Sequence, residues 1–267
     1  MKRSKPAFAI EWIHSWKAVF SAKWYLPFSA ALDFAFLVLY GFMTAPLLAR
    51  ISEHIIAIGV MLSVQMRVVE GSARPAVANV LFSPPVSRYT LQCVVLLLVL
   101  ALAVFMLYCI FQGLAWRIAG ILSGLKTHWR LFLLRFARIN LFWFGLYCLW
   151  HCISIALELR SIFIGAGRTP PGAVMYVILG LVAYFAIISY PLLNLRKAFV
   201  SGARNALVLV PAVAIVIAQF FVGNAVLKLV AGISKTAALV MGAIILLMLL
   251  AWSRAYITFV VRGLPDV

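Results

Sequence analysis

The sequence predicts an all-α, polytopic bundle of membrane helices, and three observations lead to this fold class. Hydrophobic residues make up 66% of the 267 residues, whereas charged residues make up only 11%. The mean hydropathy is +1.11. The apolar residues also gather in long runs that basic segments separate. Soluble domains carry about 25% charged residues, and a domain of this size cannot bury so much apolar surface. A soluble enzyme, a disordered chain and a disulfide scaffold are therefore excluded.

Six stretches are long and apolar enough to cross a bilayer, which takes about 20 residues. They lie at about 24–48, 89–116, 139–158, 173–194, 206–228 and 236–258. A seventh stretch, residues 54–66, is apolar but too short to cross unaided. We expect it to form a re-entrant, interfacial or short buried helix. We interpret the whole chain, residues 1–267, as a single integral membrane domain.

The basic residues indicate how the chain is oriented, because cytoplasmic loops carry an excess of Lys and Arg. With six crossings and a cytoplasmic N-terminus, 15 of the 23 basic residues lie on the cytoplasmic side. If residues 54–66 also crossed, the two sides would be nearly even. The sequence therefore predicts six crossings of the cell membrane, with both termini in the cytoplasm.

The segment before the first span, residues 1–23, is an amphipathic elbow. On a helical wheel one arc holds Phe8, Trp12, Trp16, Val19 and Phe20. Such a helix lies in the membrane interface, with its aromatic side chains in lipid and its charges in water. Two more basic segments, 126–138 and 195–205, also precede a pair of apolar stretches. This rhythm suggests a threefold repeat of elbow and helical hairpin.

The formal net charge of +17 has two interpretations. It could be the footprint of a nucleic-acid-binding protein, but the basic residues cluster between apolar spans. Anionic lipid headgroups explain it better, so we predict anionic membrane lipids and no nucleic acid as partners. The predicted headgroup contacts are Lys17, Lys23, Arg130, Arg135, Arg138, Arg196 and Lys197.

Asp33 is the only acidic residue in the middle of a predicted span. A charge at mid-bilayer costs at least ~2.5 kcal/mol, so Asp33 should face protein or water. It could be a proton or cation site, or it could pair with an arginine such as Arg254. The alternative is a protonated or hydrogen-bonded aspartate near the interface. Arg254 could equally reach the interface beside an aromatic belt without any further role.

Three polar residues, His54, Gln65 and Glu70, flank the short apolar stretch. If that stretch is re-entrant, their side chains could line a cavity. The other interpretation is that they anchor the segment at the membrane interface.

Cys148, His151 and Cys152 are the only concentrated set of metal-ligand side chains. On a helix the three project to one side, and thiolates with imidazole suit zinc or copper. However, the spacing matches no zinc module, no fourth ligand is marked, and thiols are common small hydrophobes. We therefore predict no metal and no other cofactor.

The sequence contains no glycine-rich phosphate loop, no HExxH, no GxSxG and no paired acids. These motifs supply the phosphate cradle, the zinc site, the activated serine and the acid–base pair of common enzymes. We therefore predict that the protein is not an enzyme.

The elbow-and-hairpin rhythm resembles uncharacterised six-span membrane protein families of bacteria and archaea. These include the membrane domain found beside some glycerophosphodiester phosphodiesterases. The resemblance lies in AIEWIHSWKAVFSAKWYLP (9–27), HWRLFLLRFARINLFWF (128–144) and NLRKAFVSGARNALVLVP (194–211). It implies a helical bundle and no established activity, and the phosphodiesterase domain of those relatives is absent here.

A second stretch, LFSPPVSRY (81–89), is similar to the segment before the third span of ABC-2 type export permeases. There a cytoplasmic coupling helix ends in a comparable Pro-Val-Ser-Arg run. In this chain the acidic, glycine-containing stretch is offset from it. A cytoplasmic 67–88 would also require residues 54–66 to cross.

Three functions follow from these features. The first is a non-catalytic structural or scaffold subunit of a membrane complex, with other membrane subunits or further copies of the chain as partners. The alternative is a membrane permease subunit that works with a separate ATPase. The third is a proton or small-molecule pathway that uses Asp33.

Overall fold

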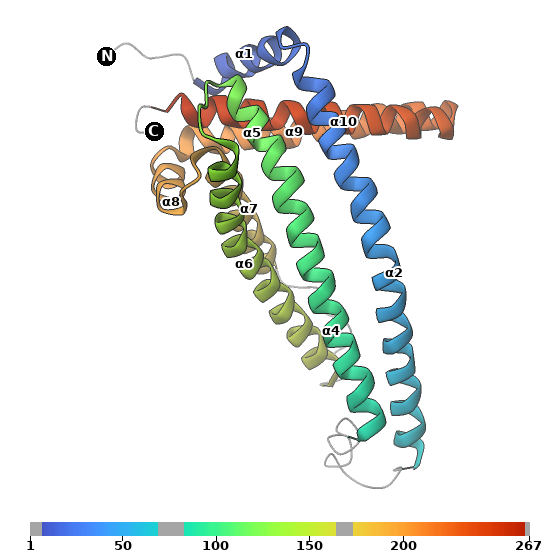
Figure 1. The fold of residues 1–267 in the computed structure, drawn as a ribbon. Coiled ribbons are helices and arrows are strands. Elements are labelled where there is room, and N and C mark those ends of the chain that lie inside the picture. The colour runs from blue at the N-terminus through green and yellow to red at the C-terminus, as the bar shows by residue number, and fades with distance from the viewer. Residues whose placement is uncertain (1–6, 69–82, 164–172, 265–267) are drawn as a thin grey trace. The chain divides into compact units, whose positions relative to one another are not determined.

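The computed structural model of the protein describes residues 7–68, 83–163 and 173–264, and in them every regular element is a helix (Figure 1). In chain order these are α1 (Ala7–Ser21), α2 (Tyr25–Val68), α4 (Pro84–Leu107), the π-helical turn η1 (Tyr108–Gln112), α5 (Gly113–Leu122), α6 (Trp129–Phe163), α7 (Ala173–Leu192), α8 (Leu195–Arg204), α9 (Ala206–Ile233) and α10 (Lys235–Arg262).

Six of the described helical stretches are long and apolar enough to cross a membrane. They are Tyr25–Met61, Pro84–Leu122, Trp129–Ile155, Met175–Leu192, Ala206–Ile233 and Lys235–Arg262. The predicted all-α, polytopic fold class is confirmed, and the protein is a multi-pass integral membrane protein.

The chain forms two compact units, residues 1–34 with 109–267 and residues 35–108. In the second unit the later part of α2 runs antiparallel to α4 (Figure 1), and Cys93 Sγ on α4 lies 3.8 Å from the Ile51 carbonyl oxygen on α2. Ring contacts link Phe36 to Tyr108 at 6.3 Å and His54 to Tyr89 at 5.5 Å. Most of its large apolar side chains are exposed, as the membrane setting requires of helices that face lipid.

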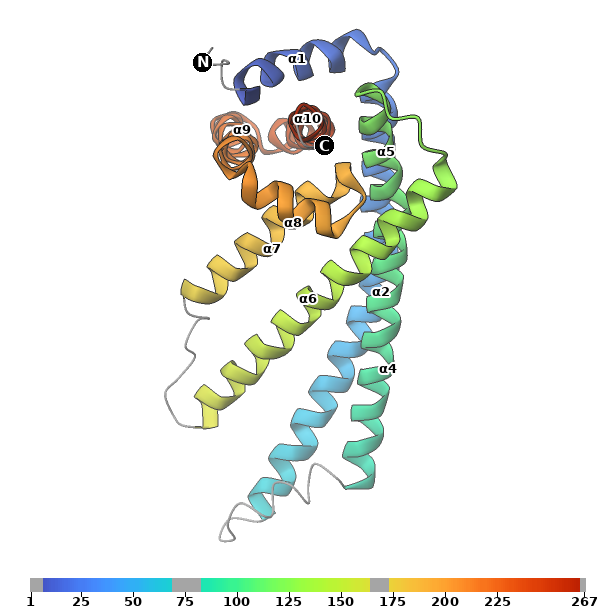
Figure 2. The same ribbon diagram turned by 90° about the vertical axis from the view of Figure 1, so that its left-hand side faces the viewer.

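The core of the first unit is the C-terminal half of α10. Its buried residues are Leu249, Ala251, Trp252, Arg254, Ala255, Tyr256, Ile257, Thr258, Val260 and Val261. Helices α1, α5, α7 and α9 all contact α10. The α9–α10 pair runs crosswise to α6 and α7 (Figures 1 and 2), and the first half of α10 carries exposed apolar side chains.

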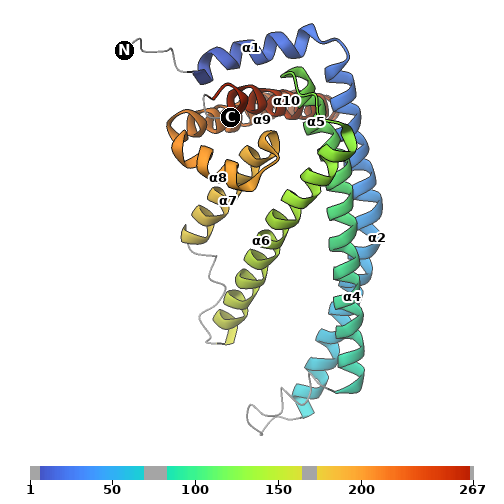
Figure 3. The same cartoon turned by 60° about the vertical axis from the view of Figure 1, so that its left-hand side comes forward.

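Helix α1 lies along the buried half of α10 (Figure 3). The indole of Trp16 stacks on that of Trp252 with 4.9 Å between ring centroids, and Trp252 Nε1 donates to Ser15 Oγ at 3.0 Å. Val19 is fully buried, whereas Phe20 is exposed. The expectation that the whole aromatic arc faces lipid is therefore wrong for Trp16 and Val19. The Trp16 ring is covered by the Trp252 indole of α10, and Val19 is buried inside the protein.

Two other elements differ from their predicted form. Residues 54–66 are not a separate short helix, because they continue α2 without a break from Tyr25 to Val68. Between Pro46 and Val68 the sequence has no proline and only one glycine, so nothing ends the helix. Residues 126–138 likewise form no separate elbow, because residues 129–138 are the first turns of α6, which begins at Trp129.

The third elbow is a helix of its own, α8, between α7 and α9. Leu193 turns the chain with a left-handed φ of 52°, and the Asn194 side chain then caps α8 by accepting from the Lys197 amide at 3.0 Å. A Cβ on Gly202 would lie 2.8 Å from Phe185 Cε1, so glycine there lets α8 approach α7 closely.

We expect Trp252→Ala to lower the free energy of unfolding by about 3–5 kcal/mol, because it removes a fully buried aromatic core residue. The loss of its stacking should also free α1, which trypsin would then cut faster after Lys17. Thermal unfolding and limited proteolysis in detergent measure both effects. The control Trp24→Ala removes an indole that is 43% exposed and should leave both readouts near wild type. Equal proteolysis of the two variants would contradict the packing of α1 on α10.

A buried polar cluster as the candidate functional site

Four polar side chains meet inside the first unit. Ser29 and Asp33 come from α2, Gln112 from η1 and Arg254 from α10. Asp33 is 1% exposed and Arg254 is 5% exposed, so the cluster is closed to the surroundings of the protein. It is the point where the first, second and sixth predicted spans come together.

The guanidinium of Arg254 organises the cluster. Its Nη1 donates to Asp33 Oδ2 at 2.8 Å and its Nη2 donates to Asp33 Oδ1 at 2.6 Å. This two-point pairing is the strongest geometry available to an arginine and a carboxylate. Nη2 also donates to Gln112 Oε1 at 2.7 Å, and Nη1 lies 3.3 Å from Ser29 Oγ.

Gln112 forms hydrogen bonds with both charged groups of the cluster. While its carbonyl oxygen accepts from Arg254, its Nε2 donates to Asp33 Oδ1 at 3.1 Å. Each member of the ion pair is therefore held by the other and by the same amide. This matters because a buried polar atom without a partner costs more than a satisfied one contributes.

Local structure explains how the side chains converge. Ser29 and Asp33 are four residues apart on α2, so they lie one above the other on the same face. Tyr25, one turn earlier, extends this face and donates its hydroxyl to the Ala251 carbonyl of α10 at 2.7 Å. Gln112 ends the π-helical turn, where the wider helix shifts its register. Such turns recur at functional sites.

The structure thus brings Asp33 and Arg254 together as one of the sequence interpretations expected. Sequence reasoning missed Ser29 and Gln112. The available signals were an amide inside the apolar stretch 89–116 and a serine one helical turn before the lone intramembrane acid.

Of the three residues expected to line a cavity, His54 is the one whose side chain the structure describes. The ring of His54 packs against Tyr89, while the side chain of Gln65 and all of Glu70 lie outside the described residues. Because α2 is continuous here, the re-entrant segment that this cavity required is absent from the described part of α2.

The weak metal candidate gains no support. No group of three or more His, Cys, Asp or Glu among the described residues could hold a metal ion. Cys148, His151 and Cys152 are all described, and the His151 ring contacts Tyr147 at 4.4 Å and Trp150 at 4.7 Å. The histidine therefore packs among aromatic rings of its own helix.

The predicted headgroup contacts divide into two groups. Four of them line one pocket where α6, α7 and α8 meet: Arg135, Arg138, Arg196 and Lys197. The other three are exposed and lie outside it: Lys17, Lys23 and Arg130. Arg130 instead lies over the Trp129 ring, 5.2 Å from its centroid.

Comparison with protein-family models, curated proteins and solved structures finds no match for this chain. The resemblances to six-span families and to ABC-2 type permeases therefore stay predictions.

We expect Arg254→Met to lower the free energy of unfolding by about 3–5 kcal/mol, because it leaves the Asp33 carboxylate buried without its partner. Replacing both partners, in Asp33→Leu with Arg254→Met, should recover most of that loss. The measurement is thermal unfolding in detergent. Arg262→Met is the control on the same helix, since Arg262 is half-buried and makes one long bond of 3.4 Å to the Ser123 carbonyl. An Arg254→Met variant as stable as wild type would contradict the role given to the pair.

Proposed function

We propose that the protein is a non-catalytic structural subunit that scaffolds a larger complex in the membrane. The observation that carries the proposal is the closed state of the polar cluster. Ionisable residues inside a membrane are first suspected of carrying ions or protons. Such a carrier must exchange protons with water, whereas both oxygens of Asp33 are engaged by Arg254 and the residue is buried. The cluster is better suited to hold α2, η1 and α10 in one arrangement.

The outer surfaces of the helices support the same function. Leu207 and Ile233, near the two ends of α9, are each 90% exposed, and Leu239 on α10 is 76% exposed. Apolar side chains in such number can face lipid or the helices of another membrane protein. A scaffold offers such faces to other membrane subunits or to further copies of its own chain.

Co-purification from native membranes in lipid nanodiscs, followed by mass spectrometry, tests the proposal. We expect other membrane subunits in a fixed ratio to the protein. A stoichiometric nucleotide-binding ATPase would instead favour the permease. Recovery of lipid alone, or of the chain only as a monomer, would contradict a scaffold.

A neutral version of the ion pair separates the scaffold from a proton pathway. Asp33→Asn with Arg254→Gln keeps hydrogen-bonding groups in the cluster but removes both charges and the titratable carboxyl. We expect this variant to co-purify with the same subunits in the wild-type ratio, since only the contact between helices is needed. The single variant Asp33→Asn, which leaves Arg254 buried without a counter-ion, should be the less stable of the two. If the neutral pair keeps its partners but abolishes a proton flux that the wild-type protein supports in vesicles, the pathway is correct and the scaffold is not the whole function.

A further inference from the structure

The pocket at one end of the α6–α7 hairpin is separate from the polar cluster and has a different chemistry. It has a volume of about 560 Å³, which is within the range of small-molecule sites. Its wall comes from the early turns of α6, the end of α7 and the start of α8. Since α6 and α7 are both long and apolar enough to span a membrane, their ends are where lipid headgroups would lie.

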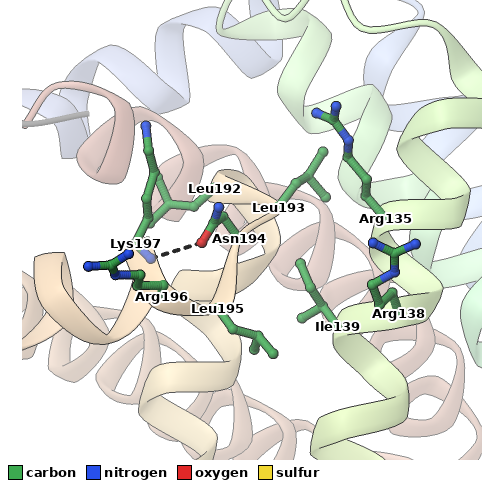
Figure 4. A pocket seen from close by; sticks show the side chains of 9 residues that line it. All are labelled: Arg135, Arg138, Ile139, Leu192, Leu193, Asn194, Leu195, Arg196 and Lys197. Carbon is green, nitrogen blue, oxygen red and sulfur yellow. Dashed lines mark hydrogen bonds between the residues drawn. The ribbon is translucent and has the colours of Figure 1, made fainter.

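The charges of this pocket all have one sign. Arg135 and Arg138 stand on the α6 side, and Arg196 and Lys197 come from the first turn of α8 (Figure 4). No acidic residue is among those that line it. In Figure 4 the Arg196 guanidinium is turned away from α6, and the Lys197 ammonium points upward on the α8 side rather than across to α6. Four cations in a lining that includes no acidic residue favour a ligand with net negative charge.

The backbone adds to this preference. Asn194 caps α8 at the pocket by accepting from the Lys197 amide at 3.0 Å. The N-terminal end of a ten-residue helix, with its partial positive charge, thus lies beside the same four cations. Arginine forks and helix N-termini are both groups that recognise phosphate.

The remaining wall of the pocket is apolar, and this favours a lipid over a free anion as the ligand. It consists of Ile139, Leu192, Leu193 and Leu195. A free phosphate has no surface that would use these side chains, whereas a phospholipid carries glycerol and acyl carbons next to its phosphate. A zwitterionic choline headgroup would bring a positive charge toward the arginines, so an anionic headgroup fits better.

We propose that this pocket binds the phosphate of an anionic phospholipid, with Arg135, Arg138 and Lys197 holding the phosphate oxygens and the leucine wall covering the adjoining apolar part. This proposal does not depend on the scaffold function, because the pocket lies apart from the polar cluster. It is tested by measuring bound lipid, whereas the scaffold is tested by measuring bound proteins.

The test titrates the full-length protein in a non-ionic detergent with dioleoyl-phosphatidylglycerol or dioleoyl-phosphatidylcholine and counts bound lipid by native mass spectrometry. We expect preferential binding of phosphatidylglycerol. Arg135→Gln with Arg138→Gln should weaken that binding about thirtyfold, since each basic residue near an anionic headgroup contributes roughly fivefold. Lys197→Gln, on the opposite wall, should weaken it about fivefold by itself.

Arg130→Gln is the matched control, because it removes the same charge from the same helix outside the pocket. It should keep wild-type affinity for phosphatidylglycerol. Equal losses in Arg130→Gln and in the double variant, or no loss in the double variant, would overturn the site.

A competition experiment separates a lipid from a free anion. Inorganic phosphate added at the lipid's own concentration should not displace the lipid. Complete displacement would mean that the pocket takes a free anion and would overturn the lipid assignment. Because the substituted side chains are exposed, thermal unfolding should match the wild type, and this verifies that each variant is folded.

Discussion

The first unit depends on one constraint: a charge enclosed in an apolar bundle must find its counter-charge within the protein. Asp33 and Arg254 are separated by most of the chain, yet each is the main partner of the other. Their attraction alone does not repay the loss of hydration, and the geometry succeeds because Gln112 and Ser29 take up further hydrogen-bonding capacity. The position of α2 against α10 is thus determined by a polar contact, although apolar side chains supply most of the surface.

The same constraint explains why α10 is the central helix. Its buried half carries Arg254 within a run of small and aromatic residues, so it can be surrounded on several sides. Ala251 accepts from Tyr25, and Trp252 stacks on Trp16 and bonds to Ser15. The N-terminal elbow is therefore part of the folded core, and the beginning of the chain is held by its end. In the proposed scaffold function, this fixed centre would keep the helices that contact α10 in one arrangement.

The outer part of the molecule has two kinds of surface with different chemistry. Long apolar faces on α9, α10 and the α2–α4 pair suit lipid chains or other membrane helices. The basic pocket, by contrast, lies at one end of the α6–α7 hairpin and suits a phosphate. Anchoring one hairpin end to headgroups would limit how far these helices can tilt or slide in the bilayer. A bound lipid could therefore add to the rigidity that the polar cluster provides.

Composition and periodicity determined the fold class and the six spans, and they singled out Asp33 and Arg254 as ionisable residues within or at the end of a span. They could do so because bilayer thickness sets the length of an apolar run and because a buried charge is costly wherever it stands in the sequence. Tertiary structure decided which faces meet. Periodicity showed that Trp16 and Val19 share an arc, but not that Trp16 stacks on Trp252 of α10 or that Val19 is buried. Likewise, no local pattern could reveal that Gln112 completes the ion pair. Nor could it show that Arg135 and Arg138 line the same pocket as Lys197, about 60 residues further along the chain, because a helix face identifies its partner only once the chain has folded.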